Sequence, residues 1–127
     1  MKLIDAKGRE ISIQIKPSDY PVKKHSRSSL QGKTGEFLLQ KYPYAQLLED
    51  WTIPGSRMSL DFYAPSLYKA WEVNGKQHSS FIGRFHGERN KLGFAKQKIR
   101  DVKKAKFCSD NNIELIIIET EEDLNNI

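Results

Sequence analysis

Apolar and polar residues alternate along the N-terminal half of the chain in a pattern typical of strands. The alternation predicts a hairpin over residues 2–15, with Gly8 in its turn, and three strands over 45–53, 57–63 and 67–73. Proline, glycine and serine occupy the short segments between these strands, which indicates tight turns. Because consecutive strands joined by short turns usually pair with one another, we expect an antiparallel meander.

Helical spacing of apolar residues marks two further segments. It predicts one helix over 29–42, ended by Pro43, and a second over 88–111. The second helix is expected to face the core with one apolar stripe, made of Leu92, Ala95, Ile99, Val102 and Ala105. The isoleucine-rich run that follows predicts a strand over 113–119, covered on both faces.

The order of these elements is hairpin, helix, three-stranded meander, helix and strand. This order predicts an α/β sandwich with a mixed central sheet. The 127 residues fit one domain, 1–127, without internal repeats or low-complexity segments. Within it we distinguish the hairpin and a basic loop (1–27), a core (28–119) and an acidic tail (120–127).

Composition narrows the class of protein. No apolar run approaches the length of a membrane span, and the N-terminus lacks the apolar stretch of a signal peptide. The chain has one cysteine, Cys108, which excludes an internal disulfide and a cysteine-rich zinc site. We therefore expect a cytoplasmic, intracellular protein, encoded by a bacterium or a phage.

The positive charge is concentrated in one segment. The net charge is +5, and residues 84–106 hold nine Lys or Arg against two acids. This distribution favours an anionic partner such as DNA, although a solvated helix face beside an acidic tail is the alternative. The candidate phosphate-binding residues are Lys23, Lys24, Arg27, Lys33, Arg84, Arg89, Lys96, Arg100, Lys103 and Lys104.

Two acids stand among apolar residues on neighbouring predicted strands. Asp61 and Glu72 can reach the same face of the sheet, and alternation returns Asn74 to the face of Glu72. Hydrolysis of a phosphodiester needs converging carboxylates that hold Mg²⁺ or Mn²⁺, with a basic or amide side chain to orient water or neutralise charge. The two acids therefore predict a metal site for phosphodiester chemistry.

The motifs around these acids resemble those of the PD-(D/E)XK nuclease superfamily, in its very-short-patch-repair-like branch. Leu60-Asp-Phe-Tyr-Ala-Pro65 is similar to the branch's "DFY-x-P" strand, and Glu72-Val-Asn-Gly-Lys-Gln-His78 to its "E-x-x-G-x-Q-H" segment. Thr34-Gly35-Glu36, Phe85-His-Gly87, Arg100-Asp101 with Lys104, and Asn112-Ile-Glu-Leu-Ile116 follow the same order as in that branch. The resemblance covers residues 28–119.

This resemblance implies a restriction-endonuclease-like fold and gives roles to individual residues. Asp61 and Glu72 would hold the metal, Glu36 would complete the site, and His78 would act as general base or phosphate contact. Asn74, Gln77 and Asp101 would be supporting residues. In the superfamily a lysine usually stands two positions after the glutamate, where this chain has Asn74. Lys76 could supply the missing ammonium, or Gln77 and His78 could replace its function.

The sequence thus predicts a Mg²⁺-dependent DNA endonuclease. Without an added recognition domain, structure-selective, nicking or repair-type cleavage is favoured over strict sequence specificity. A homodimer would allow both strands to be cut. The alternatives are an inactive nucleic-acid-binding protein on the same fold and a small interaction module.

Overall fold

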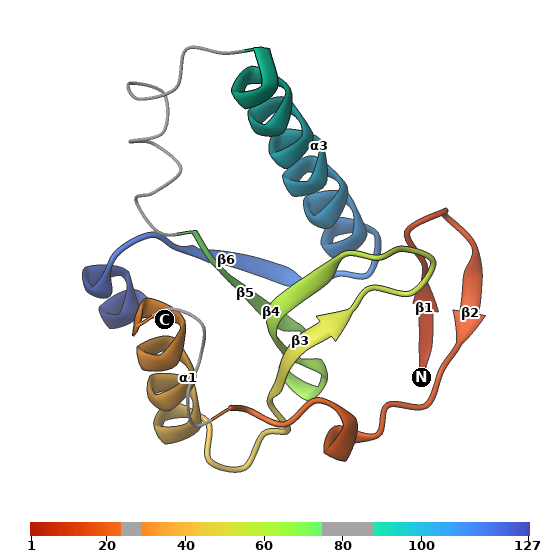
Figure 1. Cartoon of the computed structure of the whole chain (residues 1–127). Coiled ribbons are helices and arrows are strands. Elements are labelled where there is room, and N and C mark those ends of the chain that lie inside the picture. The colour runs from red at the N-terminus through yellow and green to blue at the C-terminus, as the bar shows by residue number, and fades with distance from the viewer. Residues whose placement is uncertain (24–28, 75–87) are drawn as a thin grey trace.

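The central element is a four-stranded sheet with the order β3-β4-β5-β6 (Figure 1). The computed structural model describes residues 1–23, 29–74 and 88–127. The strands are β3 (Leu48–Thr52), β4 (Ser59–Ala64), β5 (Lys69–Val73) and β6 (Glu114–Ile118). The first three form the antiparallel meander that the turn signals predict, and β6 returns parallel to β5.

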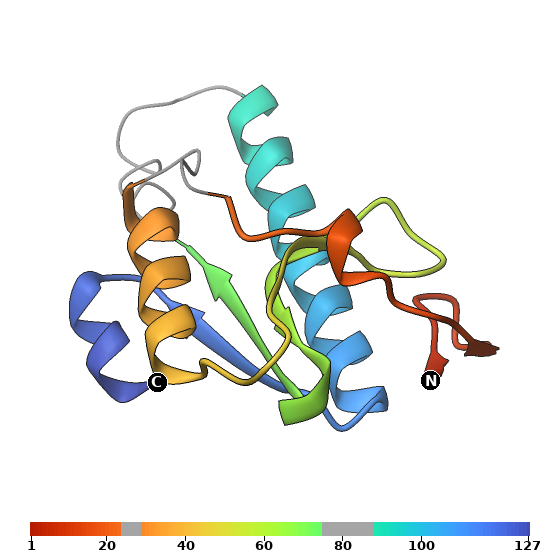
Figure 2. The ribbon, with the colours of Figure 1, turned by 90° about the horizontal axis from the view of Figure 1, so that it is seen from below.

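Two helices lie on opposite sides of this sheet, α1 (Ser29–Lys41) and α3 (Glu88–Asp110) (Figures 1 and 2). Short 3-10 helices complete the chain: η1 (Pro17–Asp19), η2 (Pro65–Leu67) and η4 (Glu121–Asn126). The predicted α/β sandwich with a mixed central sheet is therefore confirmed at the level of its elements and their order.

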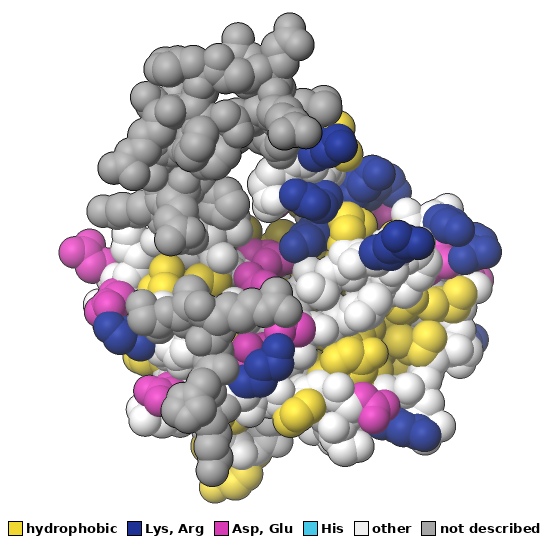
Figure 3. All heavy atoms as spheres, in the orientation of Figure 1, with side chains coloured by type: hydrophobic (Ala, Val, Ile, Leu, Met, Phe, Trp, Pro, Cys, Tyr) yellow, Lys and Arg dark blue, Asp and Glu magenta, His cyan; other side chains and the backbone are white. Residues whose placement is uncertain are grey.

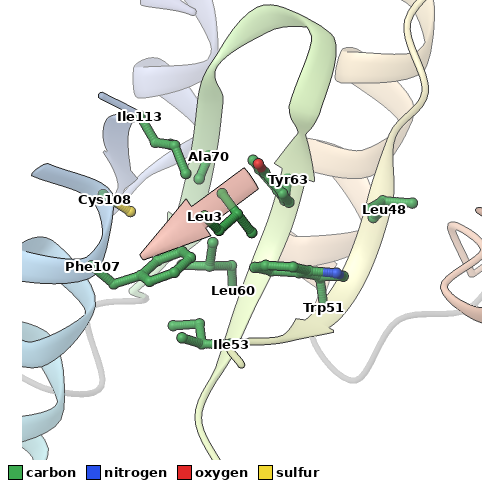
Figure 4. Packing of buried hydrophobic residues seen from close by; sticks show 10 residues of the cluster. All are labelled: Leu3, Leu48, Trp51, Ile53, Leu60, Tyr63, Ala70, Phe107, Cys108 and Ile113. Carbon is green, nitrogen blue, oxygen red and sulfur yellow. The ribbon is translucent and has the colours of Figure 1, made fainter. Parts of the chain in front are cut away.

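Each face of the sheet has its own apolar core. On the α3 side, Phe107 and Cys108 pack with Leu3 of the N-terminal hairpin and with buried aromatic residues of the sheet (Figure 4). On the α1 side, Leu38 packs with Phe62 and Trp71, and the C-terminal segment adds Leu124 and Ile127. The sheet is consequently buried on both faces over much of its area.

Helix α1 approaches the sheet closely at Gly35. A Cβ at this position would lie 3.2 Å from the ring of Phe62 and 3.3 Å from Val22. A glycine inside a helix costs about 1 kcal/mol relative to alanine. The close helix–sheet contact explains why this residue lacks a side chain.

The hairpin of β1 (Lys2–Ile4) and β2 (Glu10–Ser12) is hydrogen-bonded to the side chain of Asn111, which directly follows α3. The side chain of Asn111 accepts a hydrogen bond from the Ile4 N–H (2.7 Å) and donates to the Ile4 carbonyl (2.8 Å). It also donates to the Phe107 carbonyl of α3. Asn111 therefore forms with the backbone of β1 the hydrogen bonds that a neighbouring strand would form.

The α3 helix ends where the sequence predicts but turns a different face to the core. The expected inward stripe is wrong, because Ala95, Ile99, Val102 and Ala105 are exposed. Helix α3 extends beyond the sheet (Figure 1), so only its C-terminal part packs against the strands. Apolar spacing alone does not show how far a helix overlaps the sheet.

The last strand is also less covered than predicted. Strand β6 lies at the edge of the sheet, and the side chain of Ile117 is 41% exposed. The run of isoleucines is therefore not buried on both faces throughout. Separately, none of the helices in the described ranges has the length and apolar content needed to cross a membrane.

Replacing Asn111 with alanine should lower the free energy of unfolding by about 1–3 kcal/mol. The change leaves two backbone groups of Ile4 without their partner, which costs about this much when such groups are shielded from water. Urea titration of Asn111→Ala measures the loss. Ser109→Ala, an exposed change on the same helix, is the control; equal stability of the two variants would contradict the docking role of Asn111.

Candidate active site

The hydrogen-bonded ladder between β4 and β5 ends next to the two predicted acids. Backbone pairing runs as far as Phe62 opposite Trp71 and does not continue to Asp61 and Glu72. At this point a hydrogen bond to a side chain takes the place of the backbone pairing. The N–H of Val73 donates to Asp61 Oδ2 over 2.8 Å. Asp61 and Glu72 thus face each other at the end of the pairing between their strands.

Strand β5 stays fixed on its other side. The parallel pairing with β6 continues through Val73 opposite Ile118, and the N–H of Asn74 donates to the Ile118 carbonyl over 2.9 Å. The position of Glu72 is therefore set by β6 even where β4 no longer pairs with β5.

The side chain of Glu72 points toward α3. Trp71 packs on the α1 side, and alternation along β5 places Glu72 on the opposite face. Its side chain is 7% exposed, and Lys104 Nζ of α3 lies 2.9 Å from Glu72 Oε1. Oε1 is shielded from solvent, and within residues 1–23, 29–74 and 88–127 its close polar contact is this ion pair with Lys104, with no hydrogen bond to Oε1 in these ranges.

The environment of Glu72 favours its protonated form. Burial, followed by the hydrogen bond and the negative charge of Asp61, raises the pKa of Glu72 from 4.5 to about 8, although Lys104 opposes the shift. Two neighbouring carboxylates repel each other unless a proton or a cation compensates their charge. The charge of the pair is therefore compensated by a proton or by a cation.

The remaining predicted catalytic residues are not brought to this pair in the described part of the chain. Glu36 is exposed on α1, the helix that covers the opposite face of the sheet from Lys104. Lys76, Gln77 and His78 lie outside the described residues. Asp101 is exposed on α3, where it accepts a hydrogen bond from Gln97.

No cluster of three or more His, Cys, Asp or Glu side chains that would suit a metal ion occurs in the ranges 1–23, 29–74 and 88–127. The site as described therefore has two carboxylates. Cys108 is buried nearby, and burial, with the charge of Glu72, raises the pKa of its thiol to about 12, so it stays a neutral core residue.

The predicted phosphate-binding residues divide into exposed and paired groups. Lys96, Arg100 and Lys103 are exposed along α3, and Figure 3 shows basic side chains beside this helix with acidic side chains gathered next to them. Lys23 pairs with Asp50 and Lys33 with Glu121. The positions of Lys24, Arg27 and Arg84 and the side chain of Arg89 are outside the described part.

Glu49 on β3 is a buried acid that the sequence pattern does not single out. Its carboxylate accepts hydrogen bonds from the N–H of Lys23 (2.9 Å) and the side-chain amide of Gln31 (3.0 Å). It ties the segment before α1 to the sheet. Its place between Leu48 and Asp50 in a predicted strand gave no signal that distinguished it from a solvated glutamate.

Two open hollows lie on the surface away from the acids. One is bordered by Ser12, Gln46 and Pro65, and the other by Ile4, Tyr68 and Asn111. Neither is lined by Asp61 or Glu72.

Comparison with known proteins yields two relatives from viruses. The chain is 44% identical over 59 residues to uncharacterized protein 307L of Invertebrate iridescent virus 6, covering 46% of this chain and 29% of the relative. It is 38% identical over 64 residues to uncharacterized protein 033L of Invertebrate iridescent virus 3, covering 50% and 32%. The match thus spans less than a third of each relative. No protein-family model and no solved structure matches the chain.

Stability should fall between pH 5 and pH 9 because of Glu72. A folded-state pKa raised to about 8 means that the folded protein holds this proton more tightly than the unfolded chain. The resulting stabilisation is complete below the ordinary pKa of 4.5 and is lost as the pH rises through 8. Glu72→Gln, which cannot ionise, should remove this part of the pH dependence.

Urea unfolding of the wild type and Glu72→Gln at several pH values measures the effect. The difference should amount to a few kcal/mol, since one pKa unit corresponds to about 1.4 kcal/mol. Glu114→Gln, at an exposed carboxylate on β6, is the matched control. Parallel curves for the wild type and Glu72→Gln would show that Glu72 titrates normally.

Proposed function

We propose that this protein is a metal-dependent DNA endonuclease with a restriction-endonuclease-like fold. The observation that carries the proposal is the meeting of Asp61 and Glu72 at the end of the β4–β5 ladder, with Lys104 beside Glu72. Asp61 and Glu72 belong to the motifs that resemble those of the PD-(D/E)XK superfamily. The arrangement of elements around them is compatible with that fold.

The two carboxylates fit a small divalent cation. Mg²⁺ prefers carboxylate oxygens, and it is commonly held by one or two carboxylates, with water and substrate phosphate completing the octahedron. Glu72 Oε1 is shielded from solvent and receives no hydrogen bond from the described part of the chain, and Asp61 is close enough to raise the pKa of Glu72. Asp61 and Glu72 would hold Mg²⁺ or Mn²⁺, which supplies charge neutralisation at the phosphate and activation of water.

The protein's own residues define the rest of the chemistry. The Val73 N–H fixes the orientation of Asp61, and the pairing of β5 with β6 fixes that of Glu72. Hydrolysis places additional negative charge on the phosphate oxygens, which a nearby cationic side chain stabilises. The resemblance gives His78 the role of general base or of a phosphate contact.

The exposed basic residues of α3 supply affinity for the substrate. Lys96, Arg100 and Lys103 would contact phosphates, which gives binding without sequence information. Cleavage selected by DNA structure, nicking or repair-type action follows from this kind of binding. A homodimer would allow double-strand cleavage.

Two observations favour a second function. Glu36 does not join the two acids, and the usual lysine is replaced by Asn74, which suits a nucleic-acid-binding protein that no longer cleaves. Such a protein would bind DNA with the same salt dependence. Cleavage assays separate the two functions.

The wild-type protein should nick or cut plasmid DNA with Mg²⁺ or Mn²⁺, and EDTA should abolish the reaction. Asp61→Asn and Glu72→Gln should each lower the rate at least about 100-fold, because a group that stabilises transition-state charge is typically worth this much. Glu114→Gln should cleave at the wild-type rate. Gel electrophoresis of the plasmid forms measures the rates.

Metal binding gives a readout that does not depend on cleavage. Mn²⁺ should raise the melting temperature of the wild type, since a ligand that binds only the folded state stabilises it. The increase should be absent in Asp61→Asn and retained in Glu114→Gln. Salt-sensitive DNA binding without cleavage under any metal would instead establish the non-catalytic binding protein.

A further inference from the structure

Helix α3 carries a lysine on the side that packs against the sheet. Lys104 lies one turn before Phe107 and Cys108, which are buried in the core. Its side chain is only 16% exposed. Lysine is rarely buried to this extent without a partner, and the partner here is the Glu72 carboxylate.

We propose that Lys104 is the ammonium of the Asp61–Glu72 site, delivered from α3 rather than from the strand. It holds Glu72 in position and presents a positive charge to a phosphate bound beside the two acids. This role differs from that of the exposed lysines of α3, which contact DNA away from the reacting phosphate. The proposal rests on the proposed endonuclease function.

The geometry supports this assignment over an ordinary surface contact. Lys104 Nζ lies 2.9 Å from Glu72 Oε1, and both side chains are largely shielded from solvent. An ammonium has three N–H donors, so contact with one carboxylate oxygen leaves donors for a phosphate oxygen. Charges act more strongly on one another in such a shielded place than they do in water.

The strand itself offers no positive charge at the corresponding position. Asn74 follows Glu72 by two residues and shares its face of the sheet, but its amide is neutral. Lys104 reaches the same carboxylate from the facing helix. In this chain the ammonium beside the Glu72 carboxylate therefore comes from α3 and not from the strand.

A purely structural ion pair is the competing interpretation. Burying an ion pair contributes little net stability, because desolvation offsets the attraction. If Lys104 only compensates the charge of Glu72, its removal would affect folding and the geometry of Glu72, and a lysine supplied from another position would not restore the activity. Restoring the charge from the strand therefore discriminates between the two roles.

The test compares four variants in the Mn²⁺-dependent cleavage assay, each first checked for folding by circular dichroism. Lys104→Ala should lower kcat about 100-fold or more with a small change in KM, because the charge acts mainly on the transition state. Lys104→Arg should retain part of the activity. Adding Asn74→Lys to Lys104→Ala should restore at least about a tenth of the wild-type kcat, since the ammonium returns to the same carboxylate from the strand. The control is Lys106→Ala, which removes an exposed lysine paired with Asp110 and should cleave as the wild type.

The outcomes separate the two proposals. Wild-type cleavage together with full activity of Lys104→Ala would overturn the role of Lys104 and leave the nuclease function intact. A loss of kcat that neither Lys104→Arg nor the added Asn74→Lys reverses would show a structural role, which also overturns it. If the wild type does not cleave with any metal, the endonuclease function and the role of Lys104 fall together.

Discussion

The arrangement of this site depends on a glutamate that is buried beside an aspartate. Two carboxylates in a shielded place are unfavourable unless a proton, an ammonium or a metal ion compensates them. The fold provides the first two directly, through the raised pKa of Glu72 and the contact with Lys104. The surrounding elements hold this arrangement. Strand β6 pairs with β5, and Asp61 accepts a hydrogen bond from the N–H of Val73 where the β4–β5 pairing ends. Helix α3 brings Lys104 to the sheet.

Much of the fold follows from local patterns in the sequence. Alternating apolar residues and the turn at Pro54-Gly55-Ser56 suffice to predict the meander, and helical spacing predicts both helices to within a few residues. The orientation of α3 could not be predicted in this way. Its most regular apolar stripe, which includes Ile99 and Val102, faces away from the core, and the buried side is defined by tertiary packing at the C-terminal end.

The site was predictable only in part for the same reason. The nearness of Asp61 and Glu72 follows from strand alternation and antiparallel order, which are local properties. The contact between Lys104 and Glu72 joins a helix to a strand far away in the chain. The spacing of apolar residues along the sequence does not predict such a contact. The same limit applies to Glu36, whose place in a motif gave no measure of its exposure on α1, and to Glu49, whose partners come from other segments.

A crystal structure of the protein soaked with Mn²⁺ tests the central claim most directly. The proposed metal site predicts an anomalous-scattering peak between Asp61 and Glu72, with one oxygen of each carboxylate about 2.1 Å from the ion, a distance typical of small hard cations. Lys104 Nζ should remain beside Glu72. Asp61 and Glu72 turned away from each other, with no peak between them at saturating Mn²⁺, would contradict it.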